Sequence, residues 1–142
     1  MYTLRPAKLE DTETMMAIGH EGLRPYVEAV RGWDQEAEEK GFMDHFTPES
    51  ISIIQIEGRD IGYIKVEDLG DCLYIDGIYI EGSARSSGVG GQVLTDLISS
   101  SGKALQLRVY KVNPAANLYH RLGFKVINEE DHALIMRREA GI

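Results

Sequence analysis

The chain has 142 residues, of which 43% are hydrophobic, and 15 Lys and Arg against 23 Asp and Glu give a formal net charge of −8. This length predicts a single domain, residues 1–142, and the acidic balance argues against nucleic acid, whose binding surfaces are basic. We expect a cytoplasmic protein for three reasons. The apolar runs are too short to span a membrane, and the charged start is unlike a signal peptide. The one cysteine, Cys72, has no partner for a disulfide bond.

The first third of the chain predicts a short strand followed by two helices. Tyr2–Arg5 is β-like, and a helix then begins at Asp11 or Thr12. This helix is expected to break at Arg24-Pro25, and residues 26–30 continue it beyond a kink. A second helix is expected over residues 34–46. The inward positions of the first helix are Met15, Met16, Ile18 and Leu23.

The middle of the chain predicts three antiparallel strands joined by tight turns. The strands are Ile51–Ile56, Ile61–Val66 and Cys72–Ile80, which are rich in β-branched and aromatic residues. The turns lie at residues 57–60 and 70–71, where glycine and charged residues gather.

The last third returns to alternating helices and strands. A loop of small residues, Gly82–Gly91, opens a helix that ends at Gly102. A strand, a short helix and a hairpin follow over Ala104–Tyr110, Pro114–Leu122, Phe124–Ile127 and Ala133–Met136. The order β-α-α-β-β-β-α-β-α-β-β predicts an α+β fold with a mixed sheet.

The glycine-rich segment Ala84–Leu94 is the most informative part of the chain. It lies between a strand and a helix N-terminus, where unpaired N–H groups and the helix dipole favour an anion. It lacks the Gly-Lys-Ser/Thr of a P-loop, and Val93 stands where a dinucleotide fingerprint needs its third glycine. The remaining alternatives are another kind of phosphate loop and a structural turn.

The segment Arg85-Ser-Ser-Gly-Val-Gly90 matches the Q/R-x-x-G-x-G/A pyrophosphate loop of the GNAT superfamily of acyl-CoA-dependent N-acyltransferases. Val112–Phe124 resembles the N-P-A-x-x-L-Y-x-x-L-G-F signature of the same family. Leu4–Ala7 with Glu10-Asp11 resembles the start of the family's sequences, and Leu134–Met136 resembles a segment near their end. The resemblance therefore covers essentially the whole chain. Gly32-Trp-Asp34 also resembles a subset of small bacterial members. The chain is therefore identified as a member of this superfamily.

The resemblance implies a mostly antiparallel sheet of about seven strands with about four flanking helices, splayed between the fourth and fifth strands. These strands are Cys72–Ile80 and Ala104–Tyr110, and acetyl-CoA, as cosubstrate, would lie in the V-shaped opening between them. The backbone at Ile78, Tyr79 and Ile80 would pair with its pantetheine arm. Asn113 would contact the pantetheine or cap the following helix. The residues implied to hold the pyrophosphate are Arg85, Ser86, Ser87, Gly88, Val89, Gly90 and Gly91.

Tyr119 is the residue that the resemblance implies for chemistry, as the acid that protonates the departing CoA thiolate. The alternative is a core tyrosine on an amphipathic helix. The base that deprotonates the amine is open. Strand alternation puts Asp76 on the face of Ile78 and Ile80, toward the opening, and Glu67 is a second candidate. Either carboxylate can also be an ordinary solvated side chain.

By the same resemblance, residues 22–34 border the pocket for the acceptor amine, and Tyr26 and Trp33 are its candidate binding residues. Acidic neighbours would favour a cationic acceptor, whereas the alternative is that Trp33 packs a helix junction. The implied function is acetyl transfer from acetyl-CoA to a primary amine by direct attack in a ternary complex. The alternative is a non-catalytic acyl-CoA-binding module. No metal or membrane partner is expected, and a homodimer is one expectation because dimers are common in the superfamily.

Overall fold

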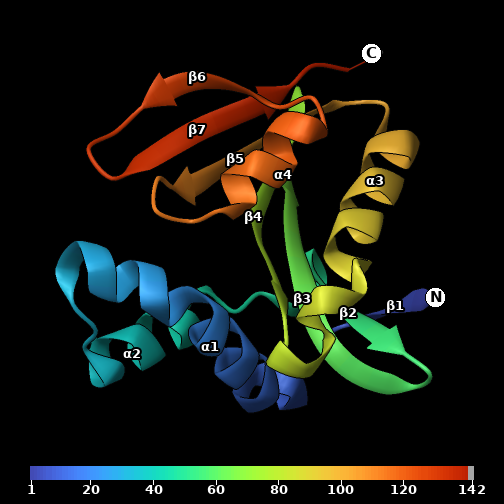
Figure 1. Ribbon diagram of the computed structural model, residues 1–142. Helices are drawn as coiled ribbons and strands as arrows, with labels where there is room; N and C mark the ends of the chain where they lie inside the picture. The colour runs from blue at the N-terminus through green and yellow to red at the C-terminus, as the bar shows by residue number, and fades with distance from the viewer. Residues whose placement is uncertain (141–142) are drawn as a thin grey trace.

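The computed structural model describes residues 1–140, which form one seven-stranded sheet in the order β1-β2-β3-β4-β5-β7-β6 (Figure 1). All neighbouring strands are antiparallel except β4 and β5, which are parallel. This confirms the expected mixed sheet. The strands are β1 (Tyr2–Pro6), β2 (Ile51–Ile56), β3 (Arg59–Asp68), β4 (Cys72–Ile80), β5 (Ala104–Tyr110), β6 (Lys125–Glu129) and β7 (Ala133–Arg138).

Two helices cover each face of this sheet (Figure 1). The helices are α1 (Thr12–Arg31), α2 (Gln35–His45), α3 (Val89–Ser101) and α4 (Ala115–Arg121), with 3-10 turns η1 (Leu9–Asp11), η2 (Pro48–Ser50) and η3 (Gly82–Ser87). Asp34 caps α2, because its carboxylate accepts the Ala37 N–H at 3.2 Å. Among the described helices, none combines the length and the apolar character that crossing a membrane requires.

The predicted break in the first helix is wrong, since α1 is one helix with Pro25 inside it, whereas the expected continuation of the helix over residues 26–30 is confirmed. A proline inside a helix removes one backbone hydrogen bond but need not end the helix when packing holds both sides. Val27, two residues beyond the proline, is completely buried. The second half of α1 is therefore held by its contacts with the rest of the molecule.

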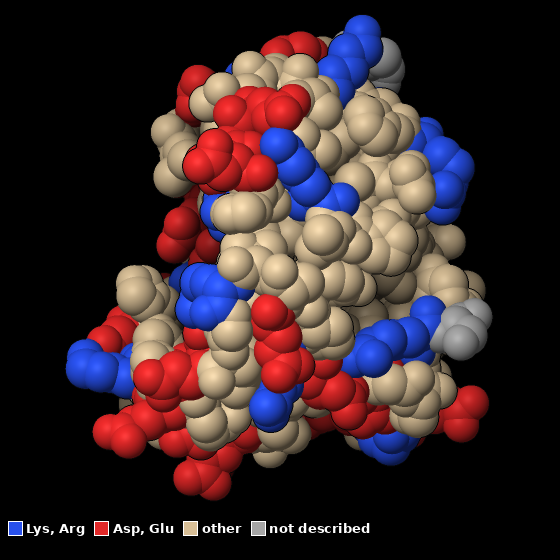
Figure 2. Space-filling view, turned by 60° about the vertical axis from the view of Figure 1, so that its left-hand side comes forward, with Lys and Arg blue, Asp and Glu red and all other residues tan. Residues whose placement is uncertain are grey.

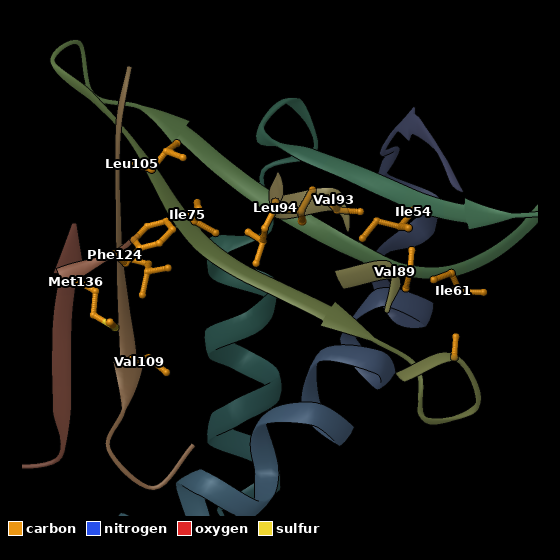
Figure 3. Close-up of a cluster of buried hydrophobic side chains, with 13 residues drawn as sticks. Ile54, Ile61, Ile75, Val89, Val93, Leu94, Leu105, Val109, Phe124 and Met136 are labelled. Carbon is orange, nitrogen blue, oxygen red and sulfur yellow. The ribbon is translucent and has the colours of Figure 1, made fainter. Parts of the chain in front are cut away.

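The hydrophobic core is divided between the two sheet faces, because successive strand residues point to opposite sides. Ile53 and Tyr63 pack with α1, whereas Ile54 and Ile64 belong to the larger cluster that α3 covers. Figure 3 shows this larger cluster, in which Leu94 lies close to Ile75 and Val93. The sheet thus separates a face covered by α1 and α2 from a face covered by α3 and α4.

The parallel pair β4–β5 opens partway along its length. Its ladder joins Cys72–Ile75 with Ala104–Leu107, and residues 76–80 of β4 have no partner on β5. The two strands diverge visibly beyond this point in Figure 1. The expected splay between the fourth and fifth strands is confirmed, and the opening lies where the two strands part.

Candidate functional site

Backbone groups of β4 line one side of the opening. The Glu81 N–H donates to the Ile61 carbonyl on β3 at 2.8 Å, which makes these two residues a hydrogen-bonded pair. In an antiparallel ladder such pairs alternate, so Tyr79 also turns its backbone groups toward β3. Ile78 and Ile80 therefore turn theirs away from β3, toward the opening. This is the orientation that an added strand-like ligand needs.

A β-bulge interrupts β4 where it parts from β5. The Cα partners pass from Gly77 opposite Lys65 to Ile75 opposite Val66, which leaves Asp76 as an extra residue without a partner. An extra residue reverses the order of inward and outward side chains from that point on. The bulge therefore decides which side chains of β4 reach each face.

The expectation that Asp76 shares a face with Ile78 and Ile80 is wrong for this reason. Ile75, Ile78 and Ile80 all contact the core cluster under α3 and α4. Asp76 and Gly77 instead border a pocket on the opposite face. The carboxylate still lies beside the opening, but it faces α1 and α2.

This α1–α2 pocket has a volume of about 180 Å³ and lies between α1, α2 and strands β2–β4. Its walls are mainly apolar and aromatic, with a few ionisable side chains among them. The apolar and aromatic lining residues are Leu23, Phe42, Phe46, Ile51, Tyr63 and Tyr79, and the ionisable ones are His20, Glu38, His45, Lys65 and Asp76.

Lys65 holds the polar side of this pocket together. It is the buried charged residue of the part of the chain that the structure describes. Its Nζ lies 3.0 Å from Asp76 Oδ2 and donates to the carbonyl of His45, at the end of α2, at 2.9 Å. Glu67 Oε1 is 4.0 Å from the same Nζ. Lys65 thus fixes the Asp76 carboxylate against the end of α2.

Three tyrosines and a carboxylate gather where β4 and β5 part. Burial raises the pKa of Tyr79, and Tyr119, Asp76 and Tyr110 raise it further. Burial also raises the pKa of Tyr119, whose ring centroid lies 5.9 Å from that of Phe124. Tyr119 therefore carries its proton at neutral pH, and its hydroxyl has no hydrogen-bond partner within residues 1–140.

The glycine loop lies on the opposite face, at the start of α3. The first helical hydrogen bond runs from the Gln92 N–H to the Gly88 carbonyl at 3.1 Å, so the N–H groups of residues 88–91 have no acceptor in the helix. Gly88 has a φ of 79°, a left-handed conformation that favours glycine. A Cβ on Gly91 would lie 3.8 Å from Leu118 on α4 and would narrow the space between the helices.

Arg85 is anchored within the protein rather than extended toward this space. Its Nε donates to the Ile80 carbonyl and a terminal nitrogen pairs with Glu21 on α1, each at 3.0 Å. The Ser87 hydroxyl also bonds inside the turn, to the Ala84 carbonyl at 2.6 Å. The side chain of Ser86 lies outside the described part of the structure.

The two aromatic residues predicted to bind the acceptor do not line the pocket. Trp33 stands behind His20, with ring centroids 5.1 Å apart in an edge-to-face arrangement, and its Nε1 donates to Gln35 at 2.7 Å. Tyr26 is partly buried on α1. In this structure Trp33 packs at the junction of α1 and α2 and supports the histidine that forms the wall.

The other open alternative concerned Asn113, whose Oδ1 accepts the Ala115 N–H at 2.9 Å and so caps the start of α4. Sequence reasoning missed His20, Phe42 and Lys65 as pocket residues. A lysine within the apolar run Ile61–Val66 was the available signal for Lys65. No comparable signal distinguished the other two.

Comparison with known proteins agrees with this geometry. A family model described as an acetyltransferase (GNAT) domain matches residues 47–126. Among solved structures, the chain is similar to the PaiA N-acetyltransferase of Thermoplasma acidophilum in complex with coenzyme A, with 16% identity, a TM-score of 0.77 and coverage of 98% of this chain and 99% of that one. No curated protein sequence matches.

Two further solved structures are similar over nearly their whole length. The ribosomal-protein-S18-alanine N-acetyltransferase of Escherichia coli has 21% identity and a TM-score of 0.71, with 100% of this chain and 96% of that one covered. The protein yncA of Salmonella typhimurium, solved with its cofactor acetyl-CoA, has 17% identity and a TM-score of 0.63, with 100% and 95% covered. At these identities the likeness establishes the fold.

Proposed function

The chain belongs to the acetyltransferase (GNAT) domain family, and we propose that it transfers the acetyl group of acetyl-CoA to a primary amine by direct attack in a ternary complex. One observation carries this proposal. The part of β4 that has no partner on β5 leads into the glycine loop at its end, and its residues Asp76, Gly77 and Tyr79 border the α1–α2 pocket on the other face. Two substrates that enter from opposite faces would meet at the opening. Similar structures that contain coenzyme A or acetyl-CoA support acetyl-CoA as the cosubstrate.

The cosubstrate side of the site would use backbone groups rather than charge. The N–H groups of residues 88–91 would hold the pyrophosphate at the start of α3. The outward backbone groups of Ile78 and Ile80 would bind the pantetheine arm as an added strand. Arg85 would support this side by tying the loop to Glu21 on α1. A net charge of −8 is compatible with such a site, because backbone dipoles supply the positive potential.

Positioning would supply most of the rate enhancement, because an amine and a thioester already react with each other. Holding two reactants in line can lower a barrier by roughly 7–11 kcal/mol in favourable intramolecular reactions. Tyr119 would then donate its proton to the departing thiolate, and its raised pKa keeps that proton in place at neutral pH. The hydroxyl is available for this because no described residue holds it.

Asp76 is the base that we assign to the amine. Lys65 holds one of its carboxylate oxygens at 3.0 Å, and the carboxylate borders both the pocket and the opening. Asp76→Asn should therefore lower kcat by roughly 100-fold, within the usual range for a general base, while acetyl-CoA affinity is unchanged. Glu67→Gln is the matched control, since Glu67 lies 4.0 Å from the same lysine. A large loss in Glu67→Gln with none in Asp76→Asn would transfer the role to Glu67.

The overall proposal is tested by one binding titration and one turnover assay. Acetyl-CoA should bind, ATP and NAD should not, and thiol should be released with at least one member of a diverse panel of primary amines. Failure of acetyl-CoA to bind would contradict the cosubstrate. Binding without thiol release across the panel would favour a non-catalytic acyl-CoA-binding module.

A further inference from the structure

We propose that the α1–α2 pocket selects a primary amine that carries a single aromatic ring on a short alkyl chain. This inference rests on the proposed function, because it names the acceptor of the same reaction. It follows from the size of the pocket, from its aromatic walls and from the pairing of its charges.

The size of the pocket limits the acceptor to a small molecule. Its volume of about 180 Å³ lies below the roughly 300–1,000 Å³ that drug-sized ligands occupy. An apolar cavity of about 150 Å³ can bind benzene. The α1–α2 pocket therefore has room between its walls for one six-membered ring and a few further atoms.

The walls of the pocket favour an aromatic body. A row of rings runs from α2 to β4, with centroid distances of 5.6 Å for Phe46–Phe42, 6.3 Å for Phe42–Tyr63 and 5.4 Å for Tyr63–Tyr79. Phe42 and Tyr63 meet edge to face, at 81°. A ligand ring can add to such a row in the same geometry, and each ring pair then contributes more than the buried area alone. A peptide backbone would instead leave polar groups unpaired against these rings.

The charges of the pocket favour an acceptor with one amine. Glu38 is paired with Arg31 at 2.9 Å, and Asp76 is paired with Lys65 at 3.0 Å. A polyamine needs a separate carboxylate for each further ammonium, and the described lining residues provide none that is unpaired. One ammonium can share Asp76, which lies at the end of the pocket nearest the opening.

The acidic surface lies outside the pocket rather than inside it. Figure 2 shows acidic side chains gathered over the lower half of this face, at the height of α1 and α2 in Figure 1. Glu36 and Asp44 of α2 are among the exposed acids. They would raise the local concentration of any amine cation, whereas the aromatic walls of the pocket would choose among amines.

Thiol release with 2-phenylethylamine, benzylamine, spermidine and an alanine-initiated peptide tests this selection. We expect the two ring-bearing amines to have kcat/KM values at least about tenfold above those of spermidine and the peptide. Turnover of spermidine or of the peptide with equal or higher kcat/KM would overturn the inference while leaving the acetyltransferase function intact.

A larger side chain at Gly41 would fill part of the pocket and so test it directly. Gly41 borders the pocket from α2, and a Cβ there would meet no atom within 4 Å. Gly41→Leu should therefore raise the KM for 2-phenylethylamine by about tenfold or more, with Gly41→Ala in between and acetyl-CoA affinity unchanged. Ala37→Leu is the control, because it places the same leucine side chain at an exposed position of α2 that does not line the pocket.

A direct binding measurement separates the inference from the proposed function. If acetyl-CoA binds and no amine supports thiol release, the proposed function fails. A titration with the amine alone then shows whether the pocket still selects a ring-bearing amine. Saturable binding of 2-phenylethylamine that Gly41→Leu weakens and Ala37→Leu does not would uphold the selection. An unchanged affinity in Gly41→Leu would overturn it.

Discussion

Replacing Tyr119 by phenylalanine removes a single oxygen from the place where β4 and β5 part. The ring keeps its contact with Phe124, 5.9 Å away between centroids, and no hydrogen bond within residues 1–140 is lost. The fold and the acetyl-CoA site should therefore be unchanged. Only the proton that the departing thiolate needs would be missing.

The size of the expected loss follows from this role. General acid catalysis by a positioned side chain contributes about 10²–10⁴-fold, or about 2.7–5.4 kcal/mol of barrier at 1.36 kcal/mol per factor of ten. A thiol is far more acidic than an alcohol and is itself a fair leaving group (the free cysteine thiol has a pKa of about 8.5), so the lower end of that range applies. We expect kcat to fall by about 100-fold in Tyr119→Phe, with an acetyl-CoA Kd within about twofold of the wild-type value.

The assay is thiol release at saturating acetyl-CoA and amine, together with an acetyl-CoA titration on the same preparations. Tyr2→Phe is the matched control for turnover, because it removes a hydroxyl of β1 that lies away from the opening and donates to Asp96 at 2.6 Å. Tyr2 borders the glycine loop, so this control is compared only in kcat at saturating acetyl-CoA. It should leave kcat unchanged. An unchanged kcat in Tyr119→Phe would refute the role, and a large loss in Tyr79→Phe instead would assign the acid to the neighbouring phenol.

Two further predictions concern stability. A Cβ on Gly62 would overlap the Tyr79 carbonyl oxygen, so Gly62→Ala should lower the free energy of unfolding by about 1–3 kcal/mol. A Cβ on Gly41 would meet open space, so Gly41→Ala should raise it by up to about 1 kcal/mol. Urea unfolding measures both changes. Equal stability of the two variants would contradict this packing. Burial raises the pKa of Tyr63 and of Tyr79 above the ordinary value of 10.0, so their contribution to stability is present below about pH 10 and is lost as the pH rises toward their folded values. In that pH range the free energy of unfolding should fall by up to about 1.4 kcal/mol per pH unit for each tyrosine. Tyr79→Phe should therefore make the fall of unfolding free energy with pH shallower by the contribution of one tyrosine.

Local sequence patterns were sufficient for the elements of this fold. Alternating β-branched residues predict the strands of the middle of the chain, and the hairpin turns follow from glycine and charged residues between them. The segment Arg85–Gly90 and the motif in Val112–Phe124 indicate the family because both depend on residues close together in the chain. Pro25 is the exception, since packing around Val27 carries α1 through it.

The sequence by itself therefore determined the strands, the glycine loop and the family, all of which depend on short-range backbone chemistry. Only the tertiary structure decided how the acceptor side is built. The bulge at Asp76 arises from the register of β4 against β3, and it moves the carboxylate to the opposite face from the one that simple alternation predicts. Lys65 of β3 comes together with Gly41 and Phe42 of α2, and their meeting depends on how α2 packs on the sheet. Such long-range packing leaves no pattern in neighbouring residues of the sequence. For this reason Trp33 was expected to line the acceptor pocket, whereas His20 lines it in the structure.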